Sequence, residues 1–154
     1  MDGADNELMG EILPVTGRGH GDTSKAALLT DEERGKSMVI SDPSLSDMPI
    51  IFISGEFEKQ TGYPPEEVLG RNCRFLQGPE TDPKAVQAIR DALAAKTKIT
   101  IDILNYRRDG SKFWNRLRIR PVFNANGELN YFVGTQNPIP AEDVRPLPAK
   151  TTPD

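Results

Sequence analysis

The sequence predicts a single domain of the α+β class, in which a five-stranded antiparallel sheet is combined with several short helices and one longer connecting helix. The stretches RRDGS and NANGE place Asp-Gly and Asn-Gly pairs between β-rich runs, a pattern typical of tight hairpins, so we expect the three strands that they join to be antiparallel. An Asp-Pro pair ahead of a periodic apolar stripe is typical of a helix start. The 154 residues suffice for one domain with its own core, and two full domains are not expected.

The elements follow one another in a simple order along the chain. Residues 38–41 and 50–54 are short β-rich runs separated by the turn-forming DPSLSDMP. Two helical stretches come next, EFEKQTGY and PPEEVLG, and Gly62 and Gly70 are their expected ends. A longer helix is predicted over residues 83–95, with Val86, Ile89 and Leu93 on one stripe. Three longer strands are then predicted over residues 97–106, 112–123 and 129–136.

The two ends of the chain differ from its centre. Residues 1–36 hold eight acidic and four basic side chains, which accounts for the whole net charge of -4, and we expect an N-terminal arm there with a short helix around residues 24–34. Residues 138–154 contain five prolines, which predict an extended or disordered tail without regular helix or strand. The folded domain is therefore expected over residues 37–137.

Composition excludes several classes of function. Cys73 is the only cysteine and His20 the only histidine, so neither an internal disulfide nor a zinc site of the Cys/His kind is expected, and no metal is predicted. No apolar run approaches the roughly 20 residues that span a bilayer, and no secretory signal is recognisable, so we expect a cytoplasmic protein without membrane insertion. The row Arg116, Arg118 and Arg120 is the one candidate nucleic-acid surface, but a solvated strand face explains it equally well.

Strand alternation directs three amide side chains toward the interior. Asn105 and Asn115 share the parity of the apolar positions of their strands, and Gln136 shares that of Gly134, provided that this face is the interior one. One such amide alone is usually a core residue bonded to nearby backbone. Because an unpaired buried polar group costs about 1–3 kcal/mol, three on one face favour a shared partner. A flat heterocycle with one polar edge would satisfy them, and Gly134 would leave room for it.

The segment GRNCRFLQGPETDP closely resembles the signature of light-oxygen-voltage (LOV) photoreceptor domains, a flavin-binding branch of the PAS fold. The resemblance extends to DPSLSDMPIIF, NYRRDGSKFWN, GELNYF and GTQ, and so covers roughly residues 37–137. It implies a PAS fold that encloses FMN, or another flavin, with Cys73 as the photoactive cysteine. Leu117 stands where many relatives carry Phe, and Met48 where Asn is common.

The resemblance also implies a role for each matching residue. Arg74 and Arg90 match the arginines that hold the FMN phosphate, although either alone is more often a solvated surface group. The residues implied to hydrogen-bond the flavin are Asn72, Gln77, Asn105, Asn115 and Gln136, and those implied to form its apolar walls are Val39, Ile50, Leu69, Leu76, Leu117, Ile119 and Phe132.

In function, the resemblance implies a blue-light photoreceptor and not an enzyme. Light would form a reversible bond between Cys73 and the flavin, and the Gln136 amide would then turn over and repack the last strand. Only 18 residues follow Gln136, which resembles a short LOV protein without a fused effector. Output would pass to an unknown protein partner or through a homodimer formed by the sheet and the N-terminal arm. Two alternatives stay open: a light-insensitive flavin redox protein, and a PAS interaction module without chromophore.

Overall fold

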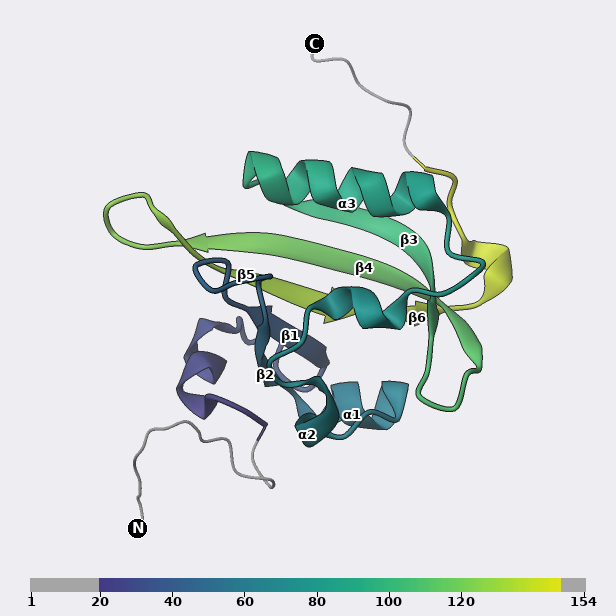
Figure 1. Cartoon of the computed structure of the whole chain (residues 1–154), viewed down its shortest axis with the longest axis horizontal. Helices are drawn as coiled ribbons and strands as arrows, with labels where there is room; N and C mark the ends of the chain where they lie inside the picture. Colours follow the sequence, from purple (N-terminus) through teal and green to yellow (C-terminus); the bar gives the residue numbers. More distant parts are fainter. Residues whose placement is uncertain (1–19, 148–154) are drawn as a thin grey trace.

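A computed structural model describes residues 20–147, and its centre is one antiparallel sheet (Figure 1). The strand order is β2-β1-β5-β4-β3, and the short β6 pairs with β4 beside the end of β5. The strands are β1 (Ser37–Ser41), β2 (Ile50–Ile53), β3 (Ile99–Tyr106), β4 (Lys112–Phe123), β5 (Leu129–Gln136) and β6 (Pro138–Ile139).

The helices between β2 and β3 lie on one face of this sheet, and α3 runs along β3 and β4 (Figure 1). They comprise three α-helices and one 3₁₀ helix, and two further 3₁₀ helices flank the sheet strands in sequence. The bounds are η1 (Thr23–Leu28), α1 (Gly55–Thr61), α2 (Pro65–Val68), η2 (Cys73–Leu76), α3 (Pro83–Ala95) and η3 (Ala141–Asp143). None of the helices between residues 20 and 147 is long and apolar enough to cross a membrane.

The ends of α3 follow from its sequence. The Asp82 carboxylate accepts a hydrogen bond from the Lys84 N–H, and Pro83 occupies the first helical position, where a missing N–H costs nothing. Lys96 ends the helix in the left-handed conformation, with φ of 58°. Ala85 is buried against Ile101 and Ile103 of β3, which fixes α3 over the edge of the sheet.

The segment before β1 packs against the opposite side of β1 and β5. Leu29 is buried in a cluster with residues of β1, β2 and β5, and the Arg120 guanidinium of β4 donates to both Glu33 carboxylate oxygens at 2.9 and 2.7 Å. Thr30 and Glu33 form the reciprocal hydrogen bonds of a capping box, but Gly35 at φ of 87° follows at once. The short helix expected over residues 24–34 is therefore a 3₁₀ helix over Thr23–Leu28 followed by turns.

Five strands occur where the sequence predicts them, and β6 is an addition. The prolines of residues 138–154 predicted neither strand nor helix there, yet β6 and η3 form. The reason is local: β6 is two residues long and lies at a strand end, where the missing N–H of Pro138 leaves the pairing of Ile139 with Trp114 intact. The remainder of this tail, residues 148–154, and the first 19 residues of the N-terminal arm lie outside the described residues.

Candidate functional site

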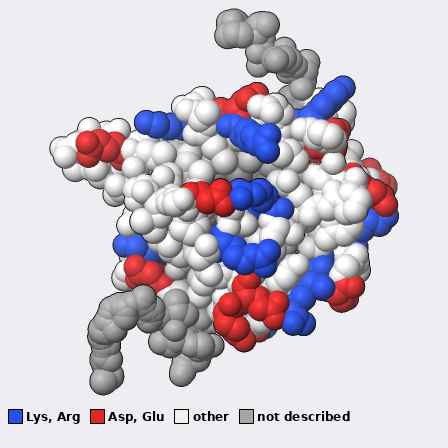
Figure 2. Space-filling view, viewed as in Figure 1, with Lys and Arg blue, Asp and Glu red and all other residues white. Residues whose placement is uncertain are grey.

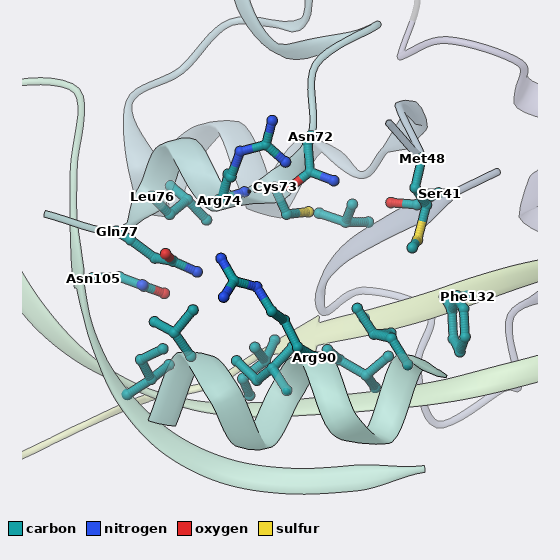
Figure 3. Close-up of a pocket in the computed structure, with 18 of the residues that line it drawn as sticks. Ser41, Met48, Asn72, Cys73, Arg74, Leu76, Gln77, Arg90, Asn105 and Phe132 are labelled. Carbon is teal, nitrogen blue, oxygen red and sulfur yellow. Dashed lines mark hydrogen bonds between the residues drawn. The ribbon is translucent and has the colours of Figure 1, made fainter. Parts of the chain in front are cut away.

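The inner face of the sheet, η2 and α3 enclose a cavity of about 280 Å³, close to the lower end of the ~300–1,000 Å³ typical of ligand pockets (Figure 3). Its walls are mainly apolar, with amides, two arginines and one thiol among them. The lining residues are Val39, Ser41, Met48, Asn72, Cys73, Arg74, Leu76, Gln77, Val86, Ile89, Arg90, Leu93, Ile103, Asn105, Leu117, Ile119, Phe132, Gly134 and Gln136.

The three amides that strand parity directs inward are joined to one another. All are buried, and the Nδ2 of Asn115 donates to Asn105 Oδ1 at 2.9 Å and to Gln136 Oε1 at 2.7 Å. Asn115 itself lies behind the cavity wall, between the other two. The amides therefore form one network in which Asn105 and Gln136 reach the cavity.

A backbone group fixes how all three amides are oriented. The N–H of Asn137 can only donate, and it donates to Asn115 Oδ1 at 2.9 Å. The Asn115 NH₂ must then face the other two side chains, which present their oxygens to it. Within residues 20–147 no group accepts a hydrogen bond from the Gln136 NH₂. Gln136 therefore offers a free donor to the cavity.

Cys73 begins η2 and lines the cavity on the side opposite the sheet. Asn72 caps η2 by accepting from the Arg74 N–H at 3.0 Å. Burial raises the pKa of the Cys73 thiol to about 11, and a hydrogen bond with the Ser41 side chain acts in the opposite direction. The side chain is therefore a neutral thiol at pH 7, because burial disfavours the thiolate.

The two arginines at the cavity differ in what they contact. Arg74 donates to both carboxylate oxygens of Asp47, at 2.9 and 2.6 Å, and the Asn72 Nδ2 donates to the Asp47 carbonyl at 2.8 Å. Arg90 rises from α3 toward the segment that carries Arg74 and Gln77 (Figure 3), and no residue in the described part of the chain forms an ion pair with it. Among residues 20–147, Arg90 thus lines the cavity without an ion-pair partner.

The loop between β1 and β2 closes the Met48 end of the cavity in a strained conformation. Asp47 and Met48 have φ of 62° and 45°, in the left-handed region that non-glycine residues rarely adopt. The contacts of Asp47 with Asn72 and Arg74 hold this conformation. They bring Met48 to the cavity wall.

The arginine row of β4 is largely neutralised within the protein. Arg116 donates to both carboxylate oxygens of Asp102 at 2.8 and 2.9 Å, and Arg120 is paired with Glu33. Figure 2 shows basic and acidic side chains interleaved on the face that it displays, with no broad area of one sign. The row is therefore no continuous basic strip of the kind that nucleic-acid binding requires.

Thirteen of the sixteen predicted site residues line the cavity, and three do not. Asn115 lies behind the wall, as described. Ile50 and Leu69 belong to the apolar cluster on which Cys73 packs, so they support the cavity from outside. Their individual roles toward a ligand stay predictions.

Sequence reasoning missed Ser41, although a signal existed. Ser41 shares the parity of Val39 on β1, so both point to the same face. Val86, Ile89 and Leu93 were predicted as the apolar stripe of a helix without being assigned to a cavity. These three residues and Ile103 of β3 line it.

The residues present fit a flavin. The free NH₂ of Gln136 and the amides of Gln77 and Asn105 suit the polar edge of a flat ring, and the apolar walls suit its faces. A Cβ built at Gly134 would come no nearer than 3.6 Å to the protein, so the space above this glycine belongs to the cavity. Arg90 supplies a charge for an anionic group.

Known proteins resemble this chain in sequence. The PAS domain family matches residues 35–139. The blue-light-activated histidine kinase of Brucella canis is 57% identical over 99 residues, which are 64% of this chain and 20% of that protein. The blue-light-activated histidine kinase of Brucella anthropi is 54% identical over 99 residues, again 64% of this chain and 20% of that protein. The chain thus spans about a fifth of the length of the curated relatives that it matches.

Solved LOV structures share the fold. A light-oxygen-voltage domain studied with a flavin analogue superposes with a TM-score of 0.71 at 45% identity, over 78% of this chain and 87% of that one. The dark structure of the blue-light photoreceptor Aureochrome1 LOV gives 0.70 at 36% identity, over 88% and 91%. With the family match and the cavity, these findings lead to one conclusion: the chain belongs to the PAS domain family and contains a LOV domain.

Proposed function

We propose that this LOV domain is a blue-light photoreceptor module that holds FMN in its cavity and signals through a reversible bond to Cys73. One observation carries the proposal: a neutral thiol and a free amide donor, those of Cys73 and Gln136, line the same apolar cavity. The relatives named as blue-light-activated support the same assignment.

The chain's contribution to bond formation is a protonated sulfur. A bound flavin excited by blue light would supply a ring carbon to accept the sulfur and an adjacent nitrogen to accept the hydrogen, so that an S–H bond and one C=N π bond would be exchanged for S–C and N–H bonds without an external oxidant. Cys73 would need no catalytic base for this step, because its own hydrogen would pass to the ring nitrogen. The sulfur would regain that hydrogen in the dark.

The remaining residues bind and orient. Arg90, with Arg74 beside it, would hold the phosphate, and Gln77, Asn105 and Gln136 would meet the polar groups of the ring. Phe132, Leu117 and the stripe of α3 exclude water from the ring faces. Asn115 acts through the other two amides of its network.

Gln136 would start the signal. It directs its NH₂ into the cavity, where that group can donate to an unprotonated ring nitrogen. A protonated nitrogen is itself a donor, so Gln136 must then present Oε1 in place of the NH₂. Output from this change would pass to a protein partner or a change of dimerisation, and the sensor itself turns over no substrate.

The test is the visible absorption of the purified full chain in the dark, after blue light and during recovery, beside Cys73→Ala. We expect a structured blue band that bleaches and recovers in the wild type and stays unbleached in the variant. A yellow wild type that never bleaches would instead make the chain a light-insensitive flavin protein. A colourless one that cannot be reconstituted with flavin would make it an interaction module.

A further inference from the structure

An ion pair at the edge of the cavity already occupies one of the two arginines that are expected to hold a phosphate. Arg74 lines the cavity, and its Nη1 and Nη2 donate to the two Asp47 carboxylate oxygens at 2.9 and 2.6 Å. The Arg74 and Asp47 side chains are 56% and 58% exposed, so the pair lies at the surface. The hydrogen bonds from Arg74 lower the pKa of Asp47, which is therefore a carboxylate at pH 7.

Arg74 and Arg90 cannot hold one phosphate together while this pair is intact. In Figure 3 the Arg90 guanidinium points from α3 toward Gln77, whereas the Arg74 guanidinium points away from α3. The Nη1 and Nη2 edge of a guanidinium binds one bidentate anion at a time, and in Arg74 the Asp47 carboxylate is that anion. A phosphate at the same edge would lie against the carboxylate, and two anions in contact repel each other. The phosphate must therefore take Arg74 from Asp47.

The same carboxylate also has a structural role in the loop between β1 and β2. Asp47 and Met48 hold left-handed backbone conformations, with φ of 62° and 45°. The Asn72 Nδ2 fixes the Asp47 carbonyl at 2.8 Å, and the Arg74 guanidinium fixes its carboxylate. An acidic side chain beside an expected phosphate site thus has a physical reason, because it holds the loop that carries Met48 to the cavity wall.

We propose that Asp47 is a specificity-determining residue that competes with the phosphate of the ligand for Arg74, and so weakens the preference of the cavity for FMN over riboflavin. This inference rests on the proposed function, because it concerns a flavin in the same cavity. Riboflavin has the same ring and ribityl chain but no phosphate, so it leaves the Asp47–Arg74 pair intact. Binding of FMN has to break that pair, and recognition of the phosphate then depends mainly on Arg90, which has no ion-pair partner among residues 20–147.

The experiment is a fluorescence titration of the flavin-free full chain with FMN and with riboflavin, in the dark and at one fixed salt concentration. Asp47→Asn is the test variant, because asparagine has nearly the same shape and tolerates the left-handed backbone, but lacks the charge. We expect the variant to bind FMN at least about threefold more tightly than the wild type, as the loss of a surface ion pair allows. Its affinity for riboflavin should stay within about twofold of the wild type, so the ratio of the two affinities rises.

Two controls separate competition for Arg74 from a general effect of charge. Asp42→Asn removes the same charge from the same loop, but the Asp42 carboxylate accepts from the N–H and the hydroxyl of Ser44, at 2.9 and 2.7 Å, and not from Arg74. The FMN-to-riboflavin affinity ratio should therefore stay at the wild-type value in Asp42→Asn. In a chain that already carries Arg74→Ala, the substitution Asp47→Asn should lose most of its effect on FMN binding, because no arginine is left to release.

The outcomes distinguish this inference from the proposed function. If neither flavin binds to the wild type, both fail. If both flavins bind but the affinity ratio in Asp47→Asn is unchanged or lower, the competition is wrong and the proposed function stands; a lower ratio would mean that Asp47 orients Arg74 for the phosphate. An equal rise in Asp42→Asn, or an undiminished effect beside Arg74→Ala, would also overturn the competition. Should Asp47→Asn not fold, Asp47→Gly takes its place, since glycine adopts the left-handed conformation without strain, and the same rise in the ratio is expected.

Discussion

The raised pKa of Cys73 makes stability depend on pH in a predictable way. Burial raises the pKa of this thiol from 9.0 to about 11, so between these values the unfolded chain loses the proton that the folded chain keeps. The folded state is then penalised as pH rises through 9. The cost is about 1.4 kcal/mol per pH unit over this window, and so about 1.4 kcal/mol at pH 10 relative to pH 8.

Urea unfolding of the flavin-free chain between pH 7 and pH 10 measures this cost, with Cys73→Ser as the control that does not titrate. The difference in unfolding free energy between wild type and Cys73→Ser should be constant up to about pH 8 and then move against the wild type by about 1.4 kcal/mol at pH 10. A difference that stays flat over the whole range would mean that the thiol is not desolvated, and a difference that moves in favour of the wild type would mean that a cation stabilises the thiolate. Either result would refute the account in which burial raises the pKa of this thiol.

Three further predictions concern the cavity. Gly134→Ala should leave the flavin-free chain as stable as the wild type, or up to about 1 kcal/mol more stable. It should lower flavin affinity at least tenfold, because the new methyl group occupies cavity space. Unchanged affinity in a fluorescence titration would contradict this. Ile50→Val should cost about 0.5–1.5 kcal/mol in urea unfolding and speed dark recovery severalfold, since Ile50 is buried in the cluster on which Cys73 packs; equal recovery rates would count against it. Arg90→Ala should weaken FMN binding at least tenfold and leave riboflavin binding nearly unchanged, and Arg74→Ala should do less because Asp47 already pairs with Arg74; a larger effect at Arg74 would reverse this assignment.

Local sequence signals account for most of the fold. The Asp-Gly and Asn-Gly pairs predicted both hairpins, and Asp82 and Pro83 predicted the start of α3. The two-residue alternation of strand side chains predicted that Asn105, Asn115 and Gln136 face the interior. The strand order, in which β1 inserts between β2 and β5, is set by pairing between distant segments and leaves no local pattern. The pairing of β6 with β4 was not predicted for the same reason, since no local pattern in the proline-rich stretch indicates it.

The candidate site was predictable to the same extent. Parity and the family resemblance predicted most of the residues that line the cavity, but they could not give the contacts between them. The ion pair of Asp47 with Arg74 joins a loop to a short helix, 27 positions apart, and depends on the left-handed backbone at Asp47. The bond from Asn137 to Asn115, which orients the network, likewise appears only in three dimensions.

The central claim, a reversible bond to the Cys73 sulfur, is tested most directly by light-minus-dark infrared spectroscopy of the flavin-loaded chain in the S–H stretching region. Cys73 is the only cysteine, so any S–H band of the protein belongs to it. The account predicts that one S–H band is present in the dark, disappears on blue illumination and returns during dark recovery at the rate at which the visible band recovers. An S–H band that persists through illumination while the visible band bleaches would contradict it.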